Sequence, residues 1–194
     1  MANNYKIILA SKSPRRADIL KMIGVNFKVV PSKIKEEINQ KIKQNEIPAN
    51  LSKAKAEKIS HKYPDRIIIG ADTVVVFNKK IFGKPKDKNE SKKMLKVLSG
   101  NCHEVITGVT IMNEKLGIVK TFSETTKVFV QKIPTKQIEF YVNNYNTLDK
   151  AGSYGIQEWF SVWIKKINGC YYNVMGLPVS KLYRYLIETE RLMK

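Results

Sequence analysis

The chain has 194 residues, 43% hydrophobic and 27% charged, which is typical of a folded protein and excludes a disordered or fibrous one. Its formal net charge of +18 comes from 30 lysines and 5 arginines spread along the whole chain, with no zinc finger, basic arm or aromatic-basic RNA motif. No apolar run approaches the roughly 20 residues of a membrane span and no signal peptide is recognisable, so we expect a soluble, cytoplasmic protein.

The first elements surround a pair of arginines. Residues 6–10 predict a short buried strand, and the following "SPRR" predicts a helix with Ser13 as N-cap and Pro14 at the first helical position. Arg15 and Arg16 then lie on the first turn, where the helix dipole is already positive. Either both side chains point into water, or they bind an anion together with the backbone N–H groups. A strand, a tight turn and a helix start often form a phosphate site.

The remaining elements alternate between strands and helices. We expect strands at 27–31, 67–77, 103–112, 118–130 and 159–167, and helices at 48–60, 135–144, 176–193 and after the turn "GKPKD" at 83–87. The strands at 103–112 and 118–130 are expected to form a hairpin. The pattern indicates an α/β or α+β fold with one extended, mixed sheet.

Asp72 is the most informative single residue, because it interrupts the apolar strand "IIIGADTVVVF". A buried carboxylate needs compensation, either structurally by an ion pair or a hydrogen-bonded strand end, or functionally as a metal ligand or general base. Glu36 is a second candidate carboxylate, although with Glu37 beside it a solvated loop acid is the simpler interpretation.

Two lysines are candidate partners for an oxyanion. Lys55 lies on the predicted helix 48–60, where an exposed face is the alternative, and Lys84 lies in the turn "GKPKD" between glycine and proline. Two acids for a divalent cation and several cations for oxyanions are what metal-assisted attack on a polyphosphate requires. The chain contains no Walker loop and no G-x-S-x-G motif.

The two cysteines, Cys102 and Cys170, are far apart in the sequence and form no CxxC motif. A zinc site and a disulfide are therefore disfavoured, and we expect buried free thiols.

Six ordered blocks resemble the Maf-type nucleoside triphosphate pyrophosphatases, also called septum-formation proteins. They are "LASKSPRR", "GADTVV", "GKPKD", "LSGNCHEVITGV", "DKAGSYGIQ" and "INGCYYNVMGLP", and they span residues 8–178. The resemblance implies one Maf-like domain over 1–194. It also implies a two-lobed α/β fold, similar to inosine triphosphate pyrophosphatases, with a long twisted mixed sheet flanked by helices and a nucleotide cleft between the lobes.

The resemblance further implies hydrolysis of a nucleoside triphosphate to a monophosphate and pyrophosphate with Mg²⁺ or Mn²⁺. The implied catalytic residues are Asp72, Glu36, Lys84 and Lys55, with Glu36 and Asp72 holding the metal. The implied substrate-binding residues are Ser11, Arg15, Arg16, Thr73 and Gln157. Family members are commonly dimers, so a homodimer is compatible with the resemblance.

The form "AGSYGIQ" resembles the branch of the family that acts on dTTP and UTP, with Gln157 in the loop associated with base choice. The chain departs from the family pattern directly afterwards, where Glu158, Trp159 and Phe160 replace the usual glycines. The competing functions are a nucleotide-binding regulator of division with little turnover, and a nucleic-acid binder suggested by charge alone.

Overall fold

The computed structural model describes residues 6–34 and 42–192. Its strands are β1 (Ile7–Leu9), β2 (Phe27–Val29), β3 (Ile67–Phe77), β4 (Lys80–Phe82), β5 (Cys102–Asn113), β6 (Ile118–Val130) and β7 (Ile164–Asn168). Its helices are α1 (Pro14–Met22), α2 (Ile47–Ser60), α3 (Lys88–Leu98), α4 (Thr135–Asn144), α5 (Tyr171–Met175) and α6 (Val179–Leu192), with 3₁₀ turns at Ala151–Ser153 and Trp159–Trp163. No helix in these ranges combines the length and apolarity needed to cross a membrane.

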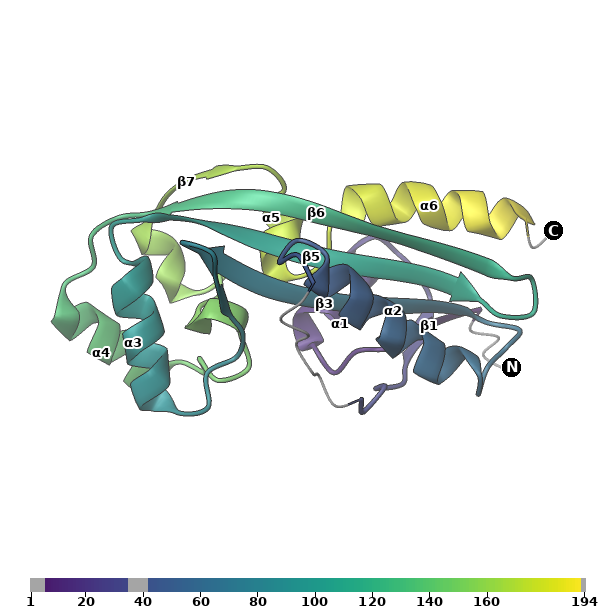
Figure 1. Cartoon of the computed structure of the whole chain (residues 1–194), viewed down its shortest axis with the longest axis horizontal. Helices are drawn as coiled ribbons and strands as arrows, with labels where there is room; N and C mark the ends of the chain where they lie inside the picture. Colours follow the sequence, from purple (N-terminus) through teal and green to yellow (C-terminus); the bar gives the residue numbers. More distant parts are fainter. Residues whose placement is uncertain (1–5, 35–41, 193–194) are drawn as a thin grey trace. The chain divides into compact units, whose positions relative to one another are not determined.

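Within the described residues, seven strands form one sheet in the order β2-β1-β3-β5-β6-β7, with β4 paired to β3 (Figure 1). Strand β1 runs parallel to both β2 and β3, whereas β4 is antiparallel to β3 and β7 is antiparallel to β6. The predicted mixed sheet flanked by helices is therefore confirmed.

The chain divides into two compact units. Unit 1 comprises Met1–Asp72, Thr107–Glu124 and Gly176–Lys194, and unit 2 comprises Thr73–Ile106 and Thr125–Met175. Strands β3, β5 and β6 contribute residues to both units. The assignment of one domain to 1–194 stays a prediction.

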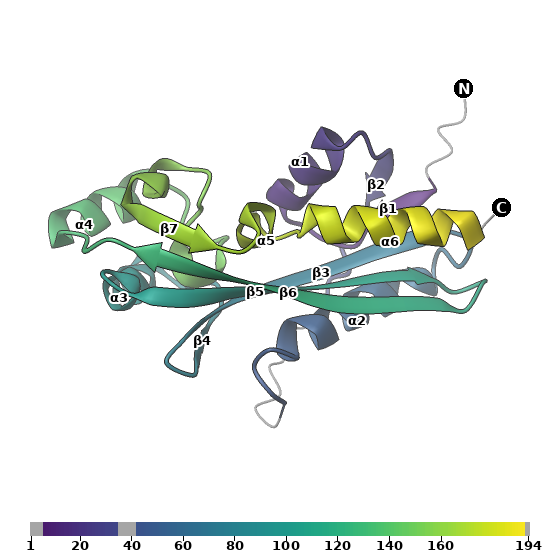
Figure 2. The ribbon, with the colours of Figure 1, turned by 90° about the horizontal axis from the view of Figure 1, so that it is seen from above.

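In unit 1, helices cover both faces of the sheet. Figure 2 shows α1 and α6 on one side of the strands and α2 on the other. On the α2 side, Ile8, Ile68 and Met112 of three strands pack with Ala56 and Ile59 of the helix. Burial on both faces explains why β1 and β3 are nearly continuous apolar runs and do not alternate.

Two glycines let α2 lie directly against the sheet. A Cβ at Gly70 of β3 would lie 2.1 Å from the carbonyl oxygen of Ser52, and one at Gly108 of β5 would lie 2.2 Å from the carbonyl carbon of Pro48. Any other residue at either position would have to displace backbone. Because side chains alternate along a strand, Gly70 and Asp72 share the face that α2 covers.

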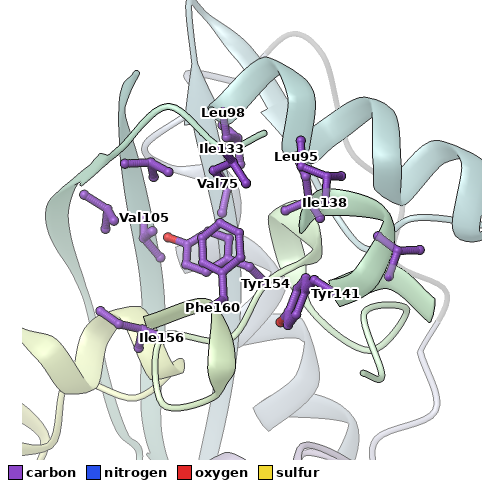
Figure 3. Packing of buried hydrophobic residues seen from close by; sticks show 13 residues of the cluster. Val75, Leu95, Leu98, Val105, Ile133, Ile138, Tyr141, Tyr154, Ile156 and Phe160 are labelled. Carbon is purple, nitrogen blue, oxygen red and sulfur yellow. The ribbon is translucent and has the colours of Figure 1, made fainter. Parts of the chain in front are cut away.

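Unit 2 has its own apolar core (Figure 3). Helix α3 contributes Leu95 and Leu98, helix α4 contributes Ile138 and Tyr141, and Phe160 follows the loop 149–158. The helix expected after the turn 83–87 is thereby confirmed. The helix begins at Asp87, whose Oδ1 accepts a hydrogen bond from the Glu90 N–H at 2.8 Å.

The predicted strand over 159–167 is wrong in its first half, because Trp159–Trp163 is a 3₁₀ turn and β7 begins at Ile164. The alternating pattern fails because successive aromatic residues pack inward. Phe160 is buried against Tyr154 with ring centroids 4.6 Å apart, while Trp159 stacks on Tyr141 at 5.7 Å.

The cysteines are free, as expected, but not buried: Cys102 is exposed and Cys170 is half-buried. Cys102 is the first residue of β5, and Cys170 lies between β7 and α5.

Candidate active site

A buried ion pair joins α2 to β3. The Nζ of Lys55 lies 2.6 Å from Oδ1 of Asp72, and both side chains are less than a tenth exposed. Because α2 packs closely on Gly70 and Gly108, its Lys55 comes within reach of Asp72. The exposed-face interpretation of Lys55 is therefore wrong, and the ion-pair interpretation of Asp72 is confirmed. An ion pair does not preclude chemistry, because buried charged pairs are also where active sites place reactive carboxylates.

Arg16 contacts β3 at Ala71, the residue before Asp72. Its Nη1 donates to Ser11 Oγ at 2.9 Å and to the Ala71 carbonyl at 2.8 Å, and its Nε donates to the Gly176 carbonyl at 2.8 Å. The guanidinium thus ties the turn before α1 to β3, one residue before Asp72, and to the segment that leads into α6. Ser11 Oγ also accepts the Ser13 N–H at 3.2 Å.

The two arginines of "SPRR" therefore differ. Arg16 is buried, whereas Arg15 on the same turn is half-buried. Pro14 occupies the first helical position as predicted, and Ser13 has the extended backbone of an N-cap, but its side chain makes no capping bond. Unit 1 accordingly brings together Ser11, Arg16, Lys55 and Asp72.

Other predicted residues belong to unit 2 or lie outside the described ranges. Thr73 follows Asp72 in β3 and is half-buried, Lys84 is exposed in the turn after β4, and Gln157 is exposed at the tip of its loop. Glu36, the second predicted metal ligand, lies outside the described residues.

The comparisons identify the family. Residues 6–189 match the model of the Maf-like protein family. This chain belongs to the Maf family. The resemblance inferred from the six sequence blocks is confirmed.

Curated relatives resemble this Maf protein over nearly its whole length. A dTTP/UTP pyrophosphatase of Carboxydothermus hydrogenoformans is 46% identical over 183 residues, covering 94% of this chain and 98% of the relative. Proteins of the same name from Cytophaga hutchinsonii and Thermosipho africanus are 48% and 49% identical, each covering 93% of this chain and 82% and 92% of the relatives. A solved structure of the Staphylococcus aureus Ham1 protein overlaps with a TM-score of 0.42 and 16% identity, covering 64% of this chain and 71% of that chain.

The donor set of this Maf chain fits a magnesium-type ion in part. Asp72 supplies a carboxylate oxygen, the ligand type that Mg²⁺ prefers, and such ions are often held by one or two carboxylates with substrate phosphates completing the shell. No group of three or more His, Cys, Asp or Glu side chains gathers in the described ranges. The fit of the described residues to such an ion therefore rests on the carboxylate of Asp72.

Sequence reasoning missed a second polar network, in unit 2. The buried Lys150 lies 2.8 Å from Asp149 Oδ1 and 3.0 Å from Glu158 Oε1, and it also donates to the carbonyl of Asn146. Tyr141 donates from its hydroxyl to Glu158 Oε2 at 3.2 Å, and burial raises the pKa of that tyrosine. The signal available in the sequence was Glu158 itself, the charged residue at a family glycine position.

A buried histidine supports the same loop. His103 Nε2 lies 2.7 Å from the Tyr154 hydroxyl, and the two rings meet edge to face with centroids 5.5 Å apart. Burial lowers the pKa of His103 to about 4 and raises that of Tyr154. His103 is therefore neutral at pH 7, and it acts as a packed hydrogen-bonding group and not as a surface charge.

Proposed function

We propose that this Maf protein hydrolyses dTTP and UTP to the nucleoside monophosphate and pyrophosphate. The observation that carries the proposal is the nearly full-length identity of 46–49% to relatives named dTTP/UTP pyrophosphatase. In this reaction water attacks the α-phosphorus and a new P–O bond forms. The bond from the α-phosphorus to the bridging oxygen breaks, and pyrophosphate leaves.

Asp72 is proposed either to accept the proton of the attacking water or to act as a metal ligand. Its fixed contact with Lys55 supports this role, because a catalytic carboxylate must be held in one orientation. Lys55 and Lys84 are proposed to neutralise charge on the phosphates. The proposed phosphate-binding residues are Ser11, Arg15 and Arg16. Thr73 is proposed as a further substrate contact. The helix start of α1 adds N–H groups that suit an anion.

A divalent cation, Mg²⁺ or Mn²⁺, is the proposed cofactor, with Asp72 and Glu36 as its protein ligands. When bound, it would reduce the negative charge on the phosphates and polarise them for attack.

Gln157 is the proposed base-reading residue. Its amide carries both a donor and an acceptor, which match the carbonyl and N–H edge of uracil and thymine. Cytosine presents an amine where uracil presents a carbonyl, so the wrong base would leave buried polar groups unpaired.

The test is a panel of nucleoside triphosphates with Mg²⁺ and with Mn²⁺, with products separated by chromatography. We expect monophosphate and pyrophosphate, with UTP and dTTP giving higher kcat/KM than CTP, ATP or GTP. Gln157→Ala is expected to flatten that ranking more than it slows the best substrate. Release of orthophosphate would contradict the proposed bond cleavage, and a purine preference would contradict the base assignment.

Two binding measurements beside this panel separate the alternatives. Tight nucleotide binding in a calorimetric titration, without turnover in the panel, would favour a regulator of division. Salt-sensitive duplex binding in a filter-binding titration at physiological ionic strength would favour a nucleic-acid binder. We further propose that 1–194 acts as one Maf-like domain in the cytoplasm. Its proposed partners are the nucleotide and a second copy of the chain, and it binds no specific nucleic acid.

A further inference from the structure

The loop 149–158 contains a tight turn that presents Gln157. The Glu158 N–H donates to the Gly155 carbonyl at 3.3 Å, which closes a four-residue turn from Gly155 to Glu158. Ile156, the second residue of the turn, is buried in the core of unit 2 (Figure 3), whereas Gln157, the third, is exposed. The turn therefore directs one side chain inward and leaves the glutamine at its tip.

Both ends of this turn are anchored by the same tyrosine. The Tyr141 hydroxyl accepts the Gly155 N–H at 3.2 Å and donates to Glu158 Oε2 at 3.2 Å. Tyr141, a residue of α4, is itself only 1% exposed and its ring packs against Trp159 and Phe160, which follow the loop. A buried, stacked ring is a rigid support, so the first and last residues of the turn are held at a fixed separation.

An ion pair locks the other carboxylate oxygen. Lys150 is 4% exposed, and its Nζ lies 3.0 Å from Glu158 Oε1. With Tyr141 on Oε2, both oxygens of Glu158 are engaged, which fixes the rotation of the carboxylate as well as its position.

Gly155 makes room for this pair. A Cβ at that position would lie 3.0 Å from Glu158 Cδ and 3.0 Å from Lys150 Cε. These contacts are tighter than ordinary packing allows, so an added methyl group would push the ion pair aside.

The start of the loop is fixed to the turn that carries Lys84. The Gly152 N–H donates to the Gly83 carbonyl at 3.0 Å, and a Cβ at Gly152 would lie 2.8 Å from Val75. Gly152 has φ +67°, a conformation that favours glycine. The loop is thus held at its beginning by backbone contacts and at its end by Glu158.

We propose that Glu158, clamped by Lys150 and Tyr141, is a positioning residue that fixes Gln157 and sets how strongly the enzyme distinguishes uracil from cytosine. This inference rests on the proposed function of Gln157. Glu158 does not touch the base. It holds the turn so that the glutamine amide meets the base edge in one orientation, and hydrogen-bond discrimination is lost when the donor and acceptor are free to shift.

The test compares Glu158→Gln with the wild-type full-length enzyme, using kcat and KM for UTP and for CTP. We expect the ratio of kcat/KM for UTP over CTP to fall about tenfold or more, mainly through a higher KM for UTP. Because Asp149 still pairs with Lys150, the variant strands no buried charge, and its Tm should fall by less than about 4 °C.

A second variant, Gly155→Ala, displaces the pair without changing any charge and should lower the same ratio. Glu139→Gln is the matched control, since it removes an exposed carboxylate of α4 and is expected to retain the wild-type ratio. A merely structural role for Glu158 would lower Tm and slow both substrates equally.

The outcomes separate the two proposals. If the wild-type enzyme prefers UTP and both variants keep that preference, the positioning role of Glu158 is wrong while the proposed function stands. If the wild-type enzyme shows no preference for UTP over CTP, the base assignment of Gln157 fails, and the role of Glu158 fails with it.

Discussion

Acid should weaken the fold through a single buried histidine, His103. The side chain is 2% exposed, and burial lowers its pKa from 6.5 to about 4. The His103 imidazole therefore binds a proton near pH 6.5 in the unfolded chain but only near pH 4 in the folded chain. Because the unfolded state holds more protons in this window, the free energy of unfolding is at its full value above about pH 6.5. It falls as the pH decreases toward 4.

The size of the effect follows from that interval. At about 1.4 kcal/mol per pH unit, the loss between pH 6.5 and pH 4 is on the order of 3 kcal/mol, and about 2 kcal/mol has been lost by pH 5. This is a large share of the stability of an ordinary domain, about 5–15 kcal/mol.

Urea unfolding at pH 8 and at pH 5 measures this loss. We compare the wild type with His103→Gln, which keeps an amide donor near the Tyr154 hydroxyl but does not titrate. Carboxylates contribute equally to both proteins, so the difference between their pH responses belongs to His103. His61→Gln is the control for loss of a surface histidine; because that side chain is 69% exposed and pairs with the exposed Glu114, its removal should change the pH response far less than His103→Gln does. Equal loss of stability in the wild type and His103→Gln would show that His103 is not the cause of the acid sensitivity.

Three further changes test the α2 side of the sheet. Asp72→Asn should retain nucleotide binding by calorimetry while turnover falls about 100-fold or more, the scale of losing a general base; wild-type turnover would make it a structural acid. Lys55→Met leaves Asp72 buried without its lysine and should reduce the free energy of unfolding by about 3–5 kcal/mol in urea titrations. Gly108→Ala places a methyl group 2.2 Å from the backbone of Pro48 and should destabilise by about 1–3 kcal/mol, whereas Gly83→Ala, with open space around its Cβ, should stay within about 0.5 kcal/mol.

The regular elements were predictable where one periodicity dominates. The bounds of β3 and α4 agree with the pattern, because a continuous apolar run and a helix start after Pro134 are each produced by local chemistry. The strand β4 and the helix α5 were missed as elements because three- and five-residue segments carry too little periodic signal. The strand predicted at 159–167 was wrong over 159–163, because the alternation there reflected aromatic packing and not a pleat, and right from Ile164 onward.

The residue types of the site were predictable from the sequence, but the burial of Lys55 was not. The sequence indicated that Asp72 needs a partner, yet Lys55 looked like an ordinary surface lysine of a helix. Lys55 is buried because Gly70 of β3 and Gly108 of β5 have no side chains to hold α2 away from the sheet. A helical pattern describes the helix alone and contains no information about the surface on which it lies.

Both polar networks, Lys55 with Asp72 and Lys150 with Glu158, depend on a nearby glycine. Lys55 reaches Asp72 because Gly70, on the same face of β3, lets α2 approach, and Lys150 reaches Glu158 because Gly155 leaves space beside the pair. A charged group can be buried only if its partner comes close enough to replace water, and a missing Cβ is the simplest way to permit that approach. A glycine within a few residues of an isolated charge in an apolar stretch therefore indicates a buried pair. Applied to "GADTVV" and to "YGIQE", this pattern points to the buried Asp72 and to the half-buried Glu158, whose partner Lys150 is buried.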